Sequence, residues 1–162
     1  MELVEGETTV ESVDDLLAQV TEIRETTGAT VQVFDARYVV DGEHLRRAVE
    51  LADRAREREA GIARDPAVEI LLYAAGRRQI DRALEMGVPD GGGPVVAVVT
   101  GGDEAAAVRR LRDLLTPAET LEAFDPDRVR TFFDVTEREL GATAGTLADI
   151  VHERVALLVV ER

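Results

Sequence analysis

Side chains able to break covalent bonds are scarce in this sequence. It contains no Cys and no Lys, which removes thiolate nucleophiles, Cys-ligated metals, Schiff bases and the lysine of a P-loop. Its single serine, Ser12, precedes an expected helix and suits an N-cap better than a nucleophile. His44 and His152 lie far apart in the sequence and form no H-E-x-x-H motif, so we expect no metal site. The chain is therefore predicted to be a binding protein without a cofactor.

One enzymatic alternative stays open at this point. A hydrolase or transferase can work with a pair of carboxylates, and the chain has 33 acidic residues. Such a site would need clustered acids in a deep apolar pocket, with pKa values raised by burial.

The segment Val95–Thr100 followed by Gly101-Gly102-Asp103-Glu104 has the order of a strand, a turn and a helix start. Bare N–H groups at a helix start bind phosphates. Here two carboxylates occupy that position and would repel an anion, and the full G-x-G-x-x-G spacing is missing. We therefore expect an ordinary turn rather than a nucleotide site.

The 162 residues are 45% hydrophobic, as expected for one folded domain spanning residues 1–162. The net charge is −14 and all 19 basic residues are Arg, a composition that we interpret as adaptation to a salt-rich cytoplasm, as in a halophilic archaeon. The acidic N-terminal sequence and the short apolar runs predict neither a targeting segment nor a membrane span. We expect a cytoplasmic protein.

Positive charge is concentrated in the middle of the chain. Arg37–Arg82 holds ten Arg and nine acidic residues, a net charge of +1, whereas the rest of the chain carries −15. Two interpretations are open: this stretch is a solvated face with helix-spaced ion pairs, or it is a face that meets phosphates.

Hydrophobic periodicity predicts one α/β (α+β) domain, with a small mixed sheet packed against several helices and a helix-rich middle and C-terminus. Strands are expected at residues 3–8, 30–35 and 95–100, and a surface loop at 89–94. Asp41 and Asp65 are placed to cap two helices. The expected helices are 13–26, 42–58, 66–75, 77–84, 103–115, 125–134, 136–140 and one in the tail 146–162, whose Val159-Val160 could instead be strand.

Residues 73–84 combine an apolar helix, Gly76 and a charged helix. Gly76 allows a bend or the close approach of another backbone. Arg78 and Arg82 are four residues apart, so on one helix face they would repel each other unless acids or a bound anion offset the repulsion.

Two stretches of the sequence resemble a known family. FDARYVVDGEHLRRA (residues 34–48) and EILLYAAGRRQIDRALEMGV (residues 69–88) are similar to the kinase-binding, tRNA-recruiting subunit of the KEOPS complex, the PRPK-binding protein (TPRKB) family. The similarity is strongest over residues 31–88 and extends more loosely through 95–100 to the C-terminal helix. The Lys and Asn residues scattered through that family are here absent or replaced by Arg and acids.

The resemblance implies a non-catalytic subunit that binds the small atypical kinase/ATPase of KEOPS and meets the other subunits only indirectly. It also implies recruitment of tRNA by its single-stranded 3′ CCA end, for synthesis of threonylcarbamoyladenosine next to the anticodon. A regulatory subunit that binds protein without touching RNA is the alternative. The RNA-binding residues expected on this basis are Arg77, Arg78, Gln79 and Ile80, joined by Arg64, Arg82 and Tyr73.

Two further assignments leave alternatives open. Tyr73 would stack on an unpaired base, or its ring would pack in the core. Four apolar residues near the C-terminus have helical spacing: Ile150, Val151, Val155 and Leu158. They would form a helix-on-helix interface with the kinase, or they would simply belong to the core.

Overall fold

The sheet is organised around β3 (Gly92–Thr100), which pairs with β1 (Glu2–Thr9) on one side and β2 (Thr30–Asp35) on the other. The computed structural model describes residues 1–9, 11, 13–143 and 145–159. The predicted single α+β domain is confirmed. The predicted mixed pairing is wrong, because both ladders are antiparallel. β1 and β2 run in the same direction, but β3 lies between them in the opposite direction and keeps them from pairing.

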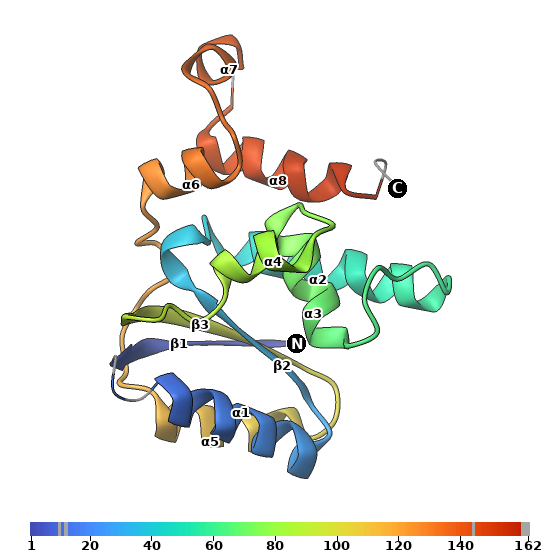
Figure 1. Cartoon of the computed structure of the whole chain (residues 1–162), viewed down its shortest axis with the longest axis vertical. Helices are drawn as coiled ribbons and strands as arrows, with labels where there is room; N and C mark the ends of the chain where they lie inside the picture. Colours follow the sequence, from blue (N-terminus) through green and yellow to red (C-terminus); the bar gives the residue numbers. More distant parts are fainter. Residues whose placement is uncertain (10, 12, 144, 160–162) are drawn as a thin grey trace.

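Two helical layers cover the two faces of the sheet (Figure 1). One face packs against α1 (Val13–Thr27) and α5 (Glu104–Leu114), and the other against α2 (Gly42–Glu57) and α3 (Pro66–Ala75). The side chains of Val95–Val99 are fully buried, because successive strand residues face opposite layers. A central strand covered on both faces has a continuous apolar sequence, and this confirms the predicted buried strand.

β3 begins at Gly92, inside the segment 89–94 that was expected to be a loop. The pairing continues that far because β1 is long enough to meet it, with Thr9 opposite Gly92. Both Gly92 (φ 74°) and Gly93 (φ 130°) have backbone angles that favour glycine, so residues typical of a turn here lie within a strand.

Capping side chains set the starts of the helices. The predicted caps are confirmed: the Asp41 carboxylate accepts from His44 N–H, and the Asp65 carboxylate accepts from Ala67 N–H. The predicted cap Ser12 lies outside the described residues. The remaining helical elements are α4 (Ile80–Ala83), α6 (Pro126–Phe132), α7 (Glu137–Ala142) and α8 (Leu147–Leu157), with 3₁₀ turns η2 (Ala36–Tyr38) and η3 (Leu84–Met86).

The predicted continuous helix 77–84 was wrong in its first part. Gly76 ends α3 in the left-handed conformation (φ 61°), and Arg77–Gln79 is not helical before α4 begins. A Cβ on Gly76 would lie 3.3 Å from the carbonyl oxygen of Arg154 in α8. Gly76 therefore provides both the bend and the close backbone approach that its position suggested. Because Arg78 precedes α4, the proposed repulsion between Arg78 and Arg82 on one helix face does not apply.

The C-terminal helix α8 ends at Leu157, and Val159 lies in a turn rather than in a strand. Val160 lies outside the described residues. None of the helices in the described part of the chain is both long enough and apolar enough to cross a membrane.

His44 joins α2 to α3 inside the core. Its ring is fully buried, with Nδ1 accepting from Val40 N–H (3.3 Å) and Nε2 placed to donate to the carbonyl oxygen of Ala74 (2.8 Å). This arrangement needs a neutral ring protonated at Nε2. Burial lowers the pKa of His44 to about 4 from its ordinary value of 6.5.

The stability of the fold should therefore fall in acid through His44. The unfolded chain takes up the proton near pH 6.5 and the folded chain only near pH 4. The stabilisation is complete above pH 6.5 and is lost as the pH falls toward 4, by about 2–3 kcal/mol at pH 4.5. Urea unfolding of the wild type and His44→Gln from pH 7.5 to 4.5 measures this. The variant starts less stable but loses less on acidification; parallel pH profiles would contradict the assignment.

Candidate nucleic-acid interface

The end of α3, the short α4 and the turn after it expose basic and apolar side chains, with the carboxylates of Asp81 and Glu85 among them. Arg78, Gln79, Ile80 and Arg82 are all exposed, and Leu84 beside them is 58% exposed. We call these five residues the α4 surface. The left-handed Gly76 positions the segment, because it turns the chain out of α3 immediately before the arginines. The structure thus brings together four of the seven predicted RNA-binding residues.

Arg77, the neighbour of this surface, has a structural role. Its side chain is only 19% exposed and its Nη2 donates to the carbonyl oxygen of Phe132, at the end of α6. The guanidinium also lies 5.1 Å from the centre of the Phe132 ring and 3.5 Å from the Asp134 carboxylate. Arg77 thereby ties the α3–α4 connection to α6.

Arg154 of α8 completes the same junction. Its Nε donates to the carbonyl oxygen of Phe133 (3.2 Å), and its guanidinium pairs with the Glu139 carboxylate at 2.7 Å. Two cations therefore satisfy carbonyl groups at the C-terminal end of α6, where the helix dipole favours positive charge.

Arg64 is exposed but lies apart from the α4 surface. It precedes α3, whereas Arg78 follows it, and a helix of ten residues is about 15 Å long. Its carbonyl oxygen accepts from Arg56 Nη1 (3.0 Å), and the neighbouring Asp65 pairs with Arg24 of α1 at 2.8 Å. Arg64 therefore lies at the opposite end of α3 from Arg78 and Arg82.

The ring of Tyr73 lies in the core, which is the second of the two alternatives considered for it. The residue is fully buried, so it presents no open face for a base to stack on. It lines a small cavity of about 160 Å³ together with two exposed arginines of the α2 end, Arg54 and Arg58. Neither arginine was among the predicted RNA-binding residues. In the sequence, only the excess of Arg between residues 37 and 82 marks them as candidates for a site.

The four apolar residues proposed for the kinase interface are also internal. Ile150 is 4% exposed, Leu158 1%, and Val151 and Val155 are fully buried in the core cluster formed with α2 and α3. In this structure the four residues therefore belong to the core, which is the second of the two roles considered for them.

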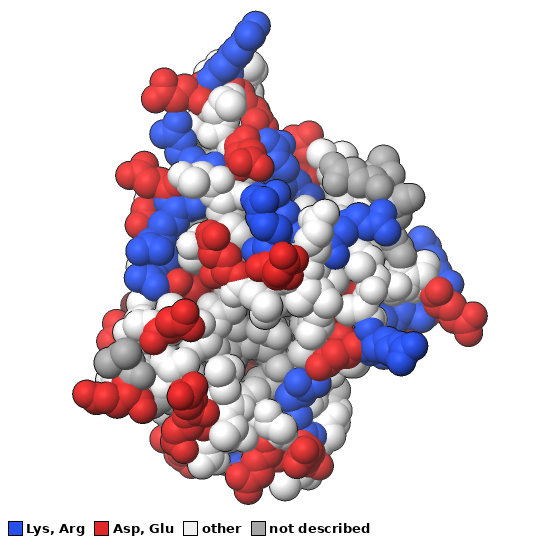
Figure 2. All heavy atoms as spheres, viewed as in Figure 1, with Lys and Arg blue, Asp and Glu red and all other residues white. Residues whose placement is uncertain are grey.

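Several arginines of the central stretch bond within the chain. Arg37 makes a two-pronged contact with the buried Asp35 carboxylate, and this hydrogen bonding raises the pKa of Arg37 above its ordinary value. Arg47 and Arg54 both pair with Glu50. Figure 2 shows basic side chains gathered mainly over the upper half and right side of this face, where α2, α4, α6 and α8 lie, whereas acidic ones prevail around α1 and α5.

In the turn after β3, the carboxylates of Asp103 and Glu104 accept hydrogen bonds from nearby backbone N–H groups. Asp103 accepts from Ala106 N–H (3.1 Å), and Glu104 accepts from Gly101 N–H (2.8 Å), which lowers the pKa of Glu104. Glu104 also pairs with the N-terminal ammonium group at 3.1 Å. The helix start is thus occupied by acids, as the sequence indicated, and their negative charge would repel a phosphate.

Among the described residues, no three His, Cys, Asp or Glu side chains gather in a way that could hold a metal ion. The imidazole of His152 instead contacts the Asp41 carboxylate at 2.9 Å and links α8 to the start of α2. The described residues thus form a small α+β domain on which the α4 surface is exposed.

The comparison with protein families identifies the particular family. The model for the kinase binding protein CGI-121 matches residues 8–158, so the chain belongs to the CGI-121 kinase-binding family. It is accordingly a non-catalytic, kinase-binding protein. No curated protein matches the chain in a direct comparison of sequences.

The structural role of Arg77 should appear as a stability difference. Removing its side chain in Arg77→Ala leaves the Phe132 carbonyl without this donor and removes the contact with the Phe132 ring. We expect a loss of about 1–3 kcal/mol in the free energy of unfolding. The exposed Arg82→Ala should stay within about 0.5 kcal/mol of the wild type. Urea unfolding at pH 7.5 measures both, and equal stability of the two variants would refute the assignment.

Proposed function

We propose that this chain is a non-catalytic accessory subunit of the KEOPS complex. It binds the atypical kinase/ATPase subunit and recruits tRNA by the single-stranded 3′ CCA end for threonylcarbamoyladenosine synthesis. Membership of the CGI-121 kinase-binding family supports the kinase contact. The observation that carries the tRNA contact is the α4 surface, where exposed Arg78 and Arg82 stand beside exposed Ile80 and Leu84.

The chemistry of the α4 surface suits an unpaired RNA end. Each guanidinium presents a planar set of donors to a phosphate or a base edge. The Gln79 amide both donates and accepts, which suits base edges, and the apolar side chains of Ile80 and Leu84 can cover the face of an unstacked base. Duplex RNA offers neither its base faces nor its Watson–Crick edges, so this surface favours single-stranded ends.

The net charge of −14 constrains how the protein holds an anion. We propose that the acidity is an adaptation to a salt-rich interior, where the Debye length at 1 M salt is about 3 Å. Long-range repulsion between protein and RNA is then screened, and counterion release contributes little. Binding depends on short contacts made by Arg forks, the Gln amide and apolar cover at the α4 surface.

Reversing charge on the α4 surface should weaken tRNA binding at least tenfold without affecting the kinase contact. The variant is Arg78→Glu plus Arg82→Glu, and Arg77 is left intact because it stabilises the fold. The matched control is Arg109→Glu plus Arg138→Glu, two exposed positions on α5 and α7 outside the α4 surface. All binding is measured in high-salt buffer. Kinase association is measured by pull-down with the cognate kinase, and tRNA affinity is measured with intact tRNA and with tRNA lacking its CCA end.

We expect at least a tenfold loss of tRNA affinity in the α4 variant, no loss in the control, and unchanged kinase association in both. Intact tRNA should bind better than tRNA without CCA. Unchanged tRNA binding by the α4 variant would favour the regulatory subunit that makes no RNA contact. The internal pairing of Arg37, Arg47 and Arg77 is the observation that supports that second candidate.

The salt dependence of RNA binding gives an independent test. A protein that relies on few phosphate contacts releases few counterions, so its affinity falls gently with added salt. We expect a smaller log–log slope of affinity against salt concentration than for a family member with a basic surface. Fluorescence anisotropy with a CCA-ended oligonucleotide from about 0.2 to 2 M KCl measures it. A slope as steep as that of a binder of many phosphates would count against short-range recognition.

A further inference from the structure

The outer edge of β1 is open over its first half. Glu7 donates its N–H to the Thr116 carbonyl (2.8 Å) and accepts from Thr116 N–H (3.0 Å), so its backbone groups point away from β3. Backbone groups of a strand alternate between its two edges, so those of Leu3 and Glu5 point the same way as those of Glu7. Within the part of the chain that the structure describes, no other segment pairs with the backbone of Leu3 or Glu5 at this edge.

The chain after α5 covers β1 only at Glu7, for local reasons. A Cβ on Gly6 would lie 2.7 Å from the Leu115 Cβ and 2.9 Å from the Thr116 carbonyl oxygen, so the missing side chain allows this approach. The next bonded pair at this edge would join Ala118 to Glu5, and no backbone hydrogen bond joins these two described residues. The pairing of this segment with β1 therefore stops before it reaches the first half of the strand.

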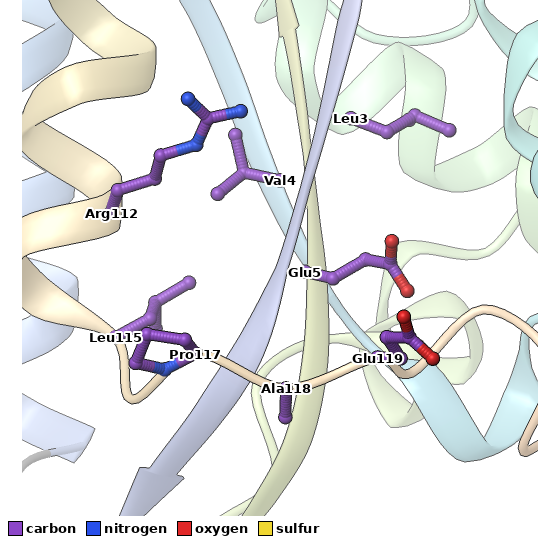
Figure 3. Close-up of a pocket in the computed structure, with 8 residues that line it drawn as sticks. All are labelled: Leu3, Val4, Glu5, Arg112, Leu115, Pro117, Ala118 and Glu119. Atoms are coloured by element: carbon purple, nitrogen blue, oxygen red, sulfur yellow. The ribbon is translucent and has the colours of Figure 1, made fainter.

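A groove of about 520 Å³ follows the open edge. Its apolar lining includes Val4, Leu115, Pro117 and Ala118. In Figure 3, Arg112 lies on one side of β1, and on the other side the carboxylates of Glu5 and Glu119 lie beside each other. We call this hollow the edge groove.

The edge groove has an acidic end. An adjoining hollow of about 440 Å³ is also lined by Glu5 and Glu119, and it adds Glu122. The Glu5 carboxylate accepts from the N–H groups of Thr120 and Leu121 (2.7 and 2.8 Å), which holds it in place. Glu119 and Glu122 are exposed, so their charge is available to a partner.

We propose that the edge groove binds an extended segment of a partner protein as a fourth strand. The backbone of Leu3 and Glu5 supplies the outward hydrogen bonds, and the apolar lining receives the partner's alternate side chains. A Lys or Arg of the partner lies against Glu5, Glu119 and Glu122, which selects a basic segment. A second copy of this chain fits poorly, because β1 carries Glu2, Glu5 and Glu7 and each chain has a net charge of −14.

The probe for this site is the acetylated and amidated peptide Arg-Val-Thr-Val-Arg, which has a basic residue at each end for either strand direction. It is titrated to millimolar concentration into the full chain, and amide NMR shifts are followed. We expect saturable shifts at the amides of Leu3 and Glu5. Binding should weaken at least tenfold for Glu119→Arg plus Glu122→Arg, and it should be unchanged for the matched control Glu137→Arg plus Glu153→Arg on α7 and α8.

Two altered peptides separate strand pairing from simple charge attraction. Glu-Val-Thr-Val-Glu should not bind, and the basic peptide with N-methylated backbone amides should lose binding although its charge is kept. No shifts at Leu3 and Glu5, equal binding of the acidic peptide, or self-association of the chain through β1 would each overturn the proposal. The tRNA affinity of the Glu119 and Glu122 variant should stay unchanged, so this result is independent of the α4 surface.

Discussion

Burial of β3 on both faces is the constraint on which the rest of the structure depends. The fully buried run Val95–Val99 requires a helical layer on each side of the sheet, which has three strands in the described part of the chain. The layer on one face consists of α1 and α5. The layer on the other face needs more helices, because α3 is itself almost entirely buried and must be covered by α2 and α8. The chain then leaves this core at Gly76, and the α4 surface forms at that exit.

The arginines divide into two groups with different physical roles. Arg37, Arg77 and Arg154 bond to a buried carboxylate or to helix-end carbonyl groups, and they hold elements together. Arg78 and Arg82 stand on the exposed surface beside Ile80 and Leu84. In a chain with 33 acidic residues, an arginine kept beside exposed apolar side chains marks a surface for a ligand better than total charge does.

The sequence predicted the sheet strands and most helix starts, because alternation of apolar residues and Asp caps are local signals. It missed the break at Arg77–Gln79, which follows the left-handed Gly76 at the end of α3. The Arg154 backbone, far away in the chain, lies so close that a Cβ on Gly76 would be 3.3 Å from its carbonyl oxygen. The same limit applies to the candidate site. Sequence spacing placed Arg77 beside Arg78, but only the packing of α6 shows that Arg77 is engaged in the fold. Periodicity likewise could not tell whether the apolar face of α8 meets a partner or the core.

The central claim is that RNA meets this protein at the exposed α4 surface. The most direct measurement is amide NMR mapping of the full chain with a short single-stranded RNA ending in CCA, at high salt. The account predicts the largest shifts at Gln79, Ile80 and Arg82, with little change at Ile150 and Val155 in α8. Saturable shifts confined to other elements, with the amides of α4 unmoved, would contradict it.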